Sequence, residues 1–230
     1  MKELAVIIPV YNEESNIKKV IKDWLKILDR KVFDIILIND GSKDKTKEII
    51  CLLKKKNLNL ILINKRNSGH GETIYTGYKY ALKKNYRYVF QVDSDDQFSH
   101  KDFNKFWKLR NKNYDLIIGN RYMRKDPWIR IFLSKYILRN LFIIFFQRKI
   151  LDANIPYRLM KSQFLDKFTK KCPPRCLAPN ILMSLYSKNT YSLNVTHYKR
   201  SKGELSWSIK KLFTFGVSLT IELIKWKKFF

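Results

Sequence analysis

The chain has few cysteines and no long uninterrupted apolar run. Its three cysteines cannot form a complete set of pairs, and the spacing of Cys172 and Cys176 differs from the CxxC of zinc or redox sites. We therefore expect buried or unreactive thiols in a reducing compartment. No stretch of about eighteen uncharged apolar residues occurs, so no membrane-spanning helix is predicted. Residues 131–146 and 212–224 come nearest to one.

Acidic residues are scarce, above all in the second half. The chain carries 47 Lys+Arg against 20 Asp+Glu, a formal charge of +27. Residues 1–120 hold 24 basic and 15 acidic residues (net +9), whereas residues 121–230 hold 23 and 5 (net +18). A half with this excess of positive charge attracts a polyanion, which can be nucleic acid, an anionic membrane surface or a phosphorylated substrate. The alternative is a compositional bias that leaves the lysines solvated.

Short apolar runs alternate with amphipathic runs in the first 120 residues. The apolar runs are rich in branched side chains, as strands covered on both faces should be. They are Leu4–Ile8, Asp34–Ile38, Asn59–Ile63, Tyr88–Val92 and Asp115–Ile118. Helices are predicted between them over Glu14–Leu28, Lys43–Lys55, Gly71–Lys84 and Lys101–Arg110, with Ser42 as the N-cap of the second. This order predicts an α/β fold with a Rossmann-like, mostly parallel sheet flanked by helices.

After residue 120 the pattern changes to basic, aromatic helices. They are predicted over 131–148, 161–170, 178–187 and 205–228, with one strand at Tyr191–His197. No Gly- or Ser-rich linker and no repeat interrupts the chain. We therefore predict one continuous domain, 1–204, with halves 1–120 and 121–204, followed by a basic aromatic tail, 205–230.

The stretch VFQVDSDDQ places three acids directly after an apolar strand in this basic chain. In an open α/β sheet, ligands lie beyond the carboxyl ends of the strands. Asp93 and Asp95 alternate along an extended segment, with Gln97 following, and two carboxylates suffice for a divalent ion that also binds phosphates. Alternation directs Asp96 away from its neighbours. The alternative is a solvated acidic turn.

A glycine-containing turn, Asn67–Gly71, follows the third predicted strand and opens a helix. Glycines let backbone N–H groups approach a phosphate, and the helix N-terminus favours negative charge. The spacing is not GxGxxG, which argues against a dinucleotide fingerprint. An ordinary helix-entry turn is the alternative, and Asp40, after the second strand, is a candidate acceptor for a base or ribose.

Five segments, taken in order, resemble the family 2 glycosyltransferases of GT-A fold. They are IIPVYNEESNI (7–17), INDGSKDKT (38–46), NSGHGETIYTGYKYAL (67–82), QVDSDDQ (91–97) and GNRY (119–122). The nearest branch is the polyprenyl-phosphate sugar transferases, of the dolichyl-phosphate mannose synthase type. The segments are specific together, although each alone is not.

The resemblance implies two groups of residues on the side of a nucleotide-diphosphate sugar donor. One group borders the base, ribose and phosphates, and the other binds Mn2+ or Mg2+ as an Asp-x-Asp motif. The first group is Pro9, Tyr11, Glu13 and Asp40, and the second is Asp93, Asp95 and Gln97. Gly69 and Gly71 of the turn described above are the candidates for the phosphates.

The same branch carries arginine-containing segments that shape an acceptor pocket. The resemblance implies that Arg121, Arg130 and Ser134 grip a lipid phosphate and that Arg200 reaches the pyrophosphate. Arginine suits both tasks because its planar fork binds phosphate oxygens bidentately. The chain departs from the branch at Pro156-Tyr157, where Gly-Phe is usual, and at His70, where Lys is frequent.

One absence bears on the acceptor. Family members that act on hydroxyls usually carry an acidic base at the helix after the acceptor loop, whereas no Asp or Glu lies between Asp166 and Glu204. A hydroxyl needs a base to take its proton, but a phosphate monoester is already anionic near neutral pH. The sequence therefore predicts inverting, metal-dependent sugar transfer to a polyprenyl phosphate. Transfer to a saccharide hydroxyl, with Asp152 as a base, is the alternative.

The basic second half then has a partner in an anionic membrane surface. Relatives often continue into transmembrane helices, so we expect either peripheral binding on the cytoplasmic side or a separate membrane subunit. The alternative for residues 205–230 is a packed helix with solvated lysines. A nucleic-acid-binding protein would leave the acids at the strand ends unexplained, and no nucleic-acid partner is expected.

Overall fold

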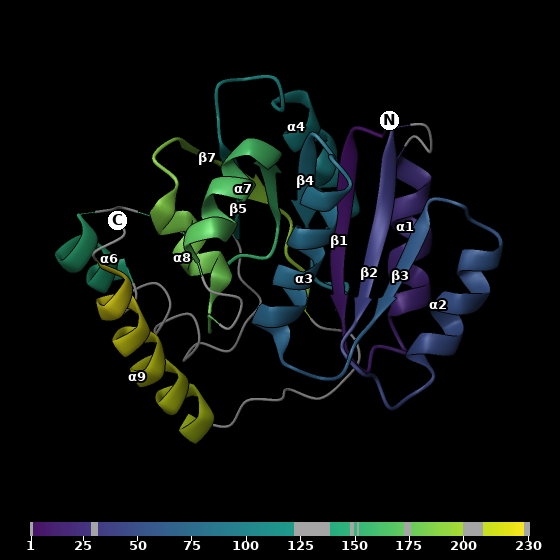
Figure 1. Ribbon diagram of the computed structural model, residues 1–230, viewed down its shortest axis with the longest axis horizontal. Helices are drawn as coiled ribbons and strands as arrows, with labels where there is room; N and C mark the ends of the chain where they lie inside the picture. The colour runs from purple at the N-terminus through teal and green to yellow at the C-terminus, as the bar shows by residue number, and fades with distance from the viewer. Residues whose placement is uncertain are drawn as a thin grey trace.

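A computed structural model describes residues 2–28, 32–121, 139–147, 150, 152–172, 176–199 and 209–227. They form a seven-stranded sheet with helices on both faces (Figure 1). The strands are β1 (Leu4–Val10), β2 (Phe33–Asn39), β3 (Leu60–Asn64), β4 (Tyr88–Gln91), β5 (Leu116–Arg121), β6 (Arg158–Lys161) and β7 (Thr190–Val195). The helices are α1 (Ile17–Ile27), α2 (Thr46–Lys55), α3 (His70–Lys83), α4 (Phe103–Lys108), α6 (Arg139–Phe146), α7 (Ser162–Lys171), α8 (Pro179–Tyr186) and α9 (Ile209–Trp226), with a 3-10 turn η1 (His100–Asp102) before α4.

The strand order is β3-β2-β1-β4-β6-β5-β7, and the predicted mostly parallel sheet is confirmed. Strands β1 to β4 pair in parallel, as do β5 and β7. Strand β6 lies between β4 and β5 and is antiparallel to both. This strand was not predicted from the sequence, because a four-residue strand that begins with Arg158 and ends with Lys161 has no apolar run to mark it. The sheet therefore continues across the predicted boundary between residues 120 and 121.

Side-chain alternation along β4 shows which helices cover which face. Phe90 packs against Trp24 of α1 and Phe103 of α4, with ring centroids 5.4 and 5.0 Å away. The next residue, Gln91, points to the other face and accepts a hydrogen bond from the Tyr78 hydroxyl of α3. Because successive side chains of a strand face opposite ways, α1 and α4 cover one face and α3 covers the other.

Helix α3 lies very close to the sheet at Gly77. A Cβ atom at this position would lie 2.6 Å from Cγ2 of Ile7 in β1 and 2.9 Å from Cδ1 of Ile38 in β2. Only glycine fits without displacing these buried side chains. This close approach places the N-terminus of α3 beside the ends of the first strands.

Among the helices predicted in the first 120 residues, two begin three residues later than predicted. The prediction that Ser42 caps the second helix was wrong: α2 begins at Thr46, and Ser42 Oγ instead accepts a hydrogen bond from the backbone N–H of Asn12 at 3.0 Å. The carboxylate of Asp44 accepts from the Thr46 N–H at 3.0 Å, so a local turn replaces the expected cap. Helix α1 begins at Ile17 rather than Glu14, since Glu13–Asn16 form a turn.

The acidic end of η1 ties the 3-10 turn to the chain after β7. The buried carboxylate of Asp102 accepts hydrogen bonds from the Thr196 N–H at 2.7 Å and from Lys105 Nζ at 2.6 Å. Burial alone would raise the pKa of Asp102, but these hydrogen bonds lower it below its ordinary value.

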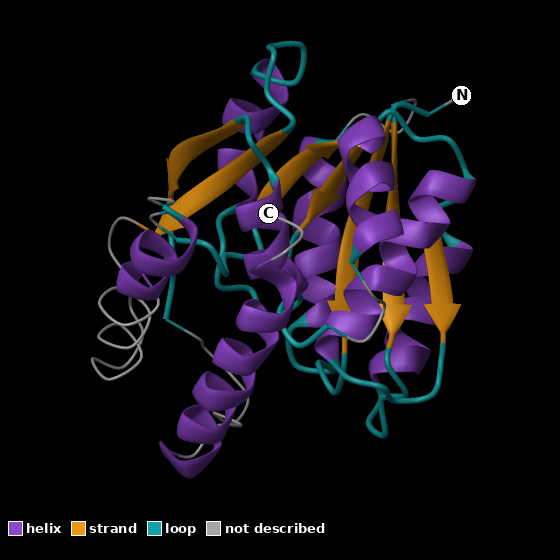
Figure 2. Ribbon diagram, turned by 60° about the vertical axis from the view of Figure 1, so that its left-hand side comes forward, coloured by secondary structure: helices purple, strands orange, loops and turns teal. Residues whose placement is uncertain are grey.

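Helix α9 presents apolar residues on two opposite sides. Leu219 and Leu223 are buried, whereas Val217, Ile221 and Ile224 are exposed. At 100° per residue these two sets fall on opposite faces of the helix. Figure 2 shows α9 on the side of the molecule away from β1, β2 and β3. Among the described residues, none of the helices has both the length and the apolar character needed to span a bilayer.

Candidate active site

The loops after β1, β2, β3 and β4 meet at one edge of the sheet, as the sequence predicted (Figure 2). Hydrogen bonds join the loops that follow β1 and β2: besides the Asn12–Ser42 contact, the Lys43 N–H donates to Asn12 Oδ1 at 2.8 Å. His70 connects the loop after β3 to the loop after β4, since its Nε2 lies 3.7 Å from Asp93 Oδ1. Polar groups from four strand ends thus share one site.

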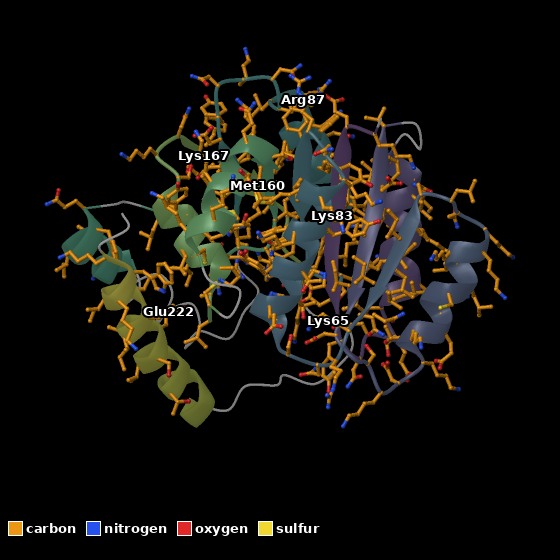
Figure 3. All side chains as sticks on the ribbon, in the orientation of Figure 1. Lys65, Lys83, Arg87, Met160, Lys167 and Glu222 are labelled. Atoms are coloured by element: carbon orange, nitrogen blue, oxygen red, sulfur yellow. The ribbon has the colours of Figure 1, made fainter. Side chains whose placement is uncertain are left out.

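Asp40, at the end of β2, organises the loop that precedes α3. Its carboxylate accepts hydrogen bonds from the N–H groups of Ser68 and Gly69, both at 3.0 Å, and pairs with Lys65 Nζ at 2.6 Å. Gly69 has φ +93°, a value that side-chain-bearing residues rarely adopt. Figure 3 labels Lys65 beside this edge of the sheet. Asp40 therefore holds the loop, and its predicted contact with a base stays a prediction.

The two glycines of the turn have different structural roles. Gly69 is the N-cap of α3 and supplies the left-handed backbone. Gly71 permits a close approach: a Cβ there would lie 2.5 Å from the carbonyl oxygen of Cys176. The N-terminus of α3, a helix of 14 residues, is suited to an anion. The phosphate contact of both glycines stays a prediction.

The three residues predicted to border the nucleotide lie in different environments. Pro9 is buried within β1, opposite Ile38 of β2. Tyr11 is exposed directly beyond the end of that strand. Glu13 is buried and accepts a hydrogen bond from Asn16 Nδ2 at 2.7 Å. Tyr11 is thus the residue of the three whose ring is accessible to a ligand.

Asp93 and Asp95 follow β4 and are partly exposed. Asp95 Oδ1 accepts a hydrogen bond from the Gln97 N–H at 3.2 Å, which orients the carboxylate. No cluster of three His, Cys, Asp or Glu side chains able to hold a metal occurs among the residues that the structure describes. Two partly exposed carboxylates fit Mn2+ or Mg2+ when phosphate oxygens and water supply the remaining ligands. The chemistry of this donor set agrees with the predicted metal.

Gln97 holds a second segment next to the two carboxylates. Its Nε2 donates to the Tyr198 carbonyl at 3.3 Å, and its own carbonyl accepts from the Tyr198 N–H at 2.8 Å. Phe98 continues this pairing with His197. The structure thus shows a positioning role for Gln97, and its role as a metal ligand stays a prediction.

Asp96 has a different partner from its two neighbours. Its φ is +58°, and its carboxylate pairs with Lys19 of α1 at 2.7 Å. The left-handed backbone turns the chain, and Lys19 fixes this turn from the side. The prediction that Asp96 points away from Asp93 and Asp95 agrees with this contact.

Arg121, at the end of β5, forms a bidentate ion pair with Asp152. Its Nε and one terminal nitrogen lie 2.7 and 2.8 Å from the two carboxylate oxygens. Both side chains are largely buried. The predicted acceptor residues Arg130, Ser134 and Arg200 lie outside the described residues. A phosphate contact of Arg121 stays a prediction, and Asp152 is engaged by a cation.

Arg158 is a buried cation whose structural role was not predicted from the sequence. Arg158 is fully buried and donates to the carbonyls of Asn180 at 2.9 Å, Ala153 at 3.1 Å and Ile155 at 3.0 Å. Burial lowers the pKa of Arg158 to about 10, and the negative charges of Asp152 and Asp93 oppose this shift. Arg158 therefore stays charged at neutral pH and joins the Asp152 loop to α8. The signal in the sequence is its place directly after Pro156-Tyr157, where the chain departs from the polyprenyl-phosphate branch.

The comparisons with other sequences are consistent with this site. The pattern of glycosyl transferase family 2 matches residues 5–168. An uncharacterized protein of Methanocaldococcus jannaschii is 34% identical over 171 residues, which cover 70% of this chain and 73% of that protein. The undecaprenyl-phosphate 4-deoxy-4-formamido-L-arabinose transferase of Edwardsiella ictaluri is 26% identical over 214 residues, which cover 91% of this chain. The alignment covers 64% of that transferase, less than two thirds of its length.

Solved structures share the fold. The glucosyl-3-phosphoglycerate synthase of Mycobacterium tuberculosis, in complex with Mn2+, uridine diphosphate and glucosyl-3-phosphoglycerate, superposes with a TM-score of 0.68 and 15% identity over 97% of this chain and 79% of that chain. Residues 1–349 of S. aureus TarS, in complex with UDP-GlcNAc, give a TM-score of 0.67 and 18% identity over 96% and 66%. These likenesses confirm the predicted GT-A fold. The family pattern covers more than half of the residues of this chain. The chain therefore belongs to glycosyl transferase family 2.

Proposed function

We propose that this chain transfers a sugar, with inversion, from a nucleotide-diphosphate sugar to a polyprenyl phosphate. The observation that carries the proposal is the engagement of Asp152, whose two oxygens are both bound by Arg121. After Asp152 the next acidic residue in the sequence is Asp166, and none lies between Asp166 and Glu204. An acceptor that is already anionic needs no base. The undecaprenyl-phosphate relatives support the same acceptor class.

The residues of the chain contribute charge and orientation to this reaction. Asp93 and Asp95 would hold Mn2+ or Mg2+, which when bound neutralises charge on the departing nucleoside diphosphate. Arg121, oriented by Asp152, would align the acceptor phosphate. The buried charge of Arg158 interacts with the carboxylates of Asp93 and Asp152 and would add a fixed positive potential near both. Arg130, Ser134 and Arg200 are proposed to complete the grip on the phosphates.

We also propose that the protein acts at the cytoplasmic face of a membrane, alone or with a separate membrane subunit. Helix α9 supports this because its exposed apolar face, formed by Val217, Ile221 and Ile224, lies opposite the face packed on the domain. The exposed Lys225 adds positive charge, and the second half of the chain has a net charge of +18. Apolar residues combined with basic charge suit an anionic lipid surface.

A donor screen tests the transfer reaction. The chain is incubated with Mn2+ or Mg2+, a panel of nucleotide sugars and a short-chain polyprenyl phosphate, and lipid products are separated by mass. We expect one donor to yield a lipid-linked sugar. Transfer to a saccharide with no lipid-linked product from any donor would refute the assignment and favour the hydroxyl acceptor.

The variant Asp95→Asn tests the metal site separately from the acceptor. We expect calorimetry to show loss of metal-dependent nucleotide binding, because the amide removes the charge that holds the cation. Asp96→Asn is the matched control, since Asp96 pairs with Lys19 and should leave nucleotide binding unchanged. Unchanged affinity in Asp95→Asn would contradict the metal role, whereas the acceptor class would still rest on the donor screen.

A further inference from the structure

Two buried thiols touch each other at a position that the transfer reaction does not use. Cys172 Sγ and Cys176 Sγ lie 3.3 Å apart, and both residues are buried. The third cysteine, Cys51, lies on α2 and is partly exposed. The lack of CxxC spacing predicted idle thiols, but the fold brings the two sulfurs into contact.

The pair lies where α7 ends, next to the first turn of α3. Cys172 directly follows the last residue of α7, and its N–H donates to the Phe168 carbonyl at 2.8 Å. The carbonyl oxygen of Cys176 faces Gly71 so closely that a methyl group there would lie 2.5 Å from it. The Tyr75 hydroxyl of α3 donates to the Thr169 carbonyl of α7 at 2.6 Å. The thiols thus connect to the helix that begins at the donor edge.

Leu177, next to Cys176, is also bound to α9. The Leu177 N–H donates to both carboxylate oxygens of Glu222, at 3.1 and 3.0 Å. Figure 3 labels Glu222 on α9, which lies beside α8 in Figure 1. Burial raises the pKa of Glu222, and the hydrogen bond from Leu177 opposes this. Residues 176–177 therefore contact the first turn of α3 on one side and the C-terminal helix on the other.

Closing a disulfide would require a small movement with a defined location. A disulfide bond is about 2.05 Å long, so the sulfurs would approach each other by about 1.2 Å from their present separation. Cys172 is held by the last turn of α7, whereas Cys176 belongs to no helix or strand. The displacement would therefore fall mainly on residues 176–177, which carry the contacts to Gly71 and Glu222.

We propose that Cys172 and Cys176 are a reversible thiol–disulfide site whose closure loosens the contacts of residues 176–177 with α3 and α9. The oxidant is a low-molecular-weight disulfide. One protein thiol loses its proton and attacks a sulfur of the oxidant, which releases one thiolate and leaves a mixed disulfide. The second protein thiol, also deprotonated, displaces the other half. Two protein thiols are oxidised, the oxidant is reduced to two thiols, and these take up the two protons.

The environment of the two thiols slows their oxidation. The hydrogen bond with Cys172, together with burial, raises the pKa of the Cys176 thiol. Since the thiolate is the attacking species, a raised pKa protects the pair against brief oxidation. In a reducing compartment the dithiol form is expected, and the disulfide accumulates only when the glutathione pool is oxidised for a sustained period.

Mass spectrometry of the native chain tests the bond. The chain is equilibrated with oxidised glutathione under native conditions, then alkylated and digested. We expect a disulfide between Cys172 and Cys176, with Cys51→Ser retaining it and Cys172→Ser losing it. Complete alkylation of both cysteines after equilibration, while the urea-unfolded chain forms the bond, would overturn the proposal. Stable glutathione adducts in place of the internal bond would overturn it as well.

Hydrogen exchange tests the consequence for the turn and does not depend on any activity. Oxidation is expected to speed exchange of the Leu177 amide at least several-fold, because its bond to Glu222 is strained or lost. The Cys172→Ser variant, treated identically, should show no change. A disulfide that forms without altering Leu177 exchange would overturn the coupling between the thiols and α9.

Discussion

The Arg121–Asp152 pair should be worth far more than an ordinary surface ion pair. The two side chains are only 12% and 7% exposed, and two hydrogen bonds of 2.7 and 2.8 Å join them. Two charges about 4 Å apart attract by about 4 kcal/mol at an effective dielectric constant near 20. Part of this attraction is offset by desolvation, so we expect a coupling of about 2–3 kcal/mol.

A double-mutant cycle measures this coupling. Urea unfolding, followed by circular dichroism, gives the free energy of unfolding for the parent, Arg121→Gln, Asp152→Asn and the double variant. Asp152→Asn alone should cost about 3–5 kcal/mol, because it leaves a buried guanidinium without its counter-charge. The double variant should recover part of this loss.

A second ion pair in the same chain provides the matched control. Lys170 and Asp166 lie 2.6 Å apart at i,i+4 on α7, but their side chains are 70% and 43% exposed. Their coupling should be about 0.3–0.5 kcal/mol. If the Arg121–Asp152 coupling were equally small, burial would not be strengthening the pair, and the orienting role assigned to Asp152 would be refuted.

Three further predictions concern stability, pH and the membrane. Gly77→Ala should lower the free energy of unfolding by about 1–2 kcal/mol, since overpacking against the sheet exceeds the gain in helix propensity. Gly216→Ala in α9, which has nothing within 4 Å of the new Cβ, should instead raise it by up to about 1 kcal/mol. The lowered pKa of Asp102 means that its contribution to stability is present above its ordinary value of 3.8 and is lost as the pH falls through the folded-state pKa. The free energy of unfolding of Asp102→Asn should therefore fall less steeply with decreasing pH below 3.8 than that of the parent. An unchanged acid-unfolding curve would contradict this. Ile221→Glu should reduce co-flotation with anionic vesicles, whereas Leu58→Glu, at a residue 99% exposed near α2, should not; equal effects would argue against docking through α9.

The fold of residues 1–120 was largely predictable because its signals are local. The runs that became β1 to β4 are apolar and branched, and parallel strands place their carboxyl ends together whatever the loops contain. This pattern alone suffices to locate Asp40, Asp93 and Asp95 at one edge of the sheet. It does not reveal that Asp40 is occupied by loop N–H groups and Lys65, because those contacts depend on the folded path of residues 65–69.

The fold of residues 121–204 was less predictable because its key contacts join remote segments. Arg121 and Asp152 lie thirty-one positions apart, and neither carries a local pattern that predicts an ion pair. Strand β6 is short, and its pairing depends on neighbours from two distant parts of the chain. The contact between Cys172 and Cys176 was not predictable because their spacing is not CxxC, and the contact arises only in the fold, where Cys172 follows the end of α7.

The position of β6 also constrains the order in which the chain can fold. Strands β1 to β4 are complete once residue 91 has been synthesised. The second neighbour of β4 in the sheet, β6, begins only at Arg158. Until β6 is made, the edge of β4 that faces away from β1 is unpaired. Strand β5 is made before β6 but cannot join the sheet, because β6 lies between β4 and β5. Long-range pairing of this kind is slow and exposes intermediates to aggregation. A nascent chain would therefore hold β1 to β4 paired while the part of the sheet formed by β6, β5 and β7 is still incomplete.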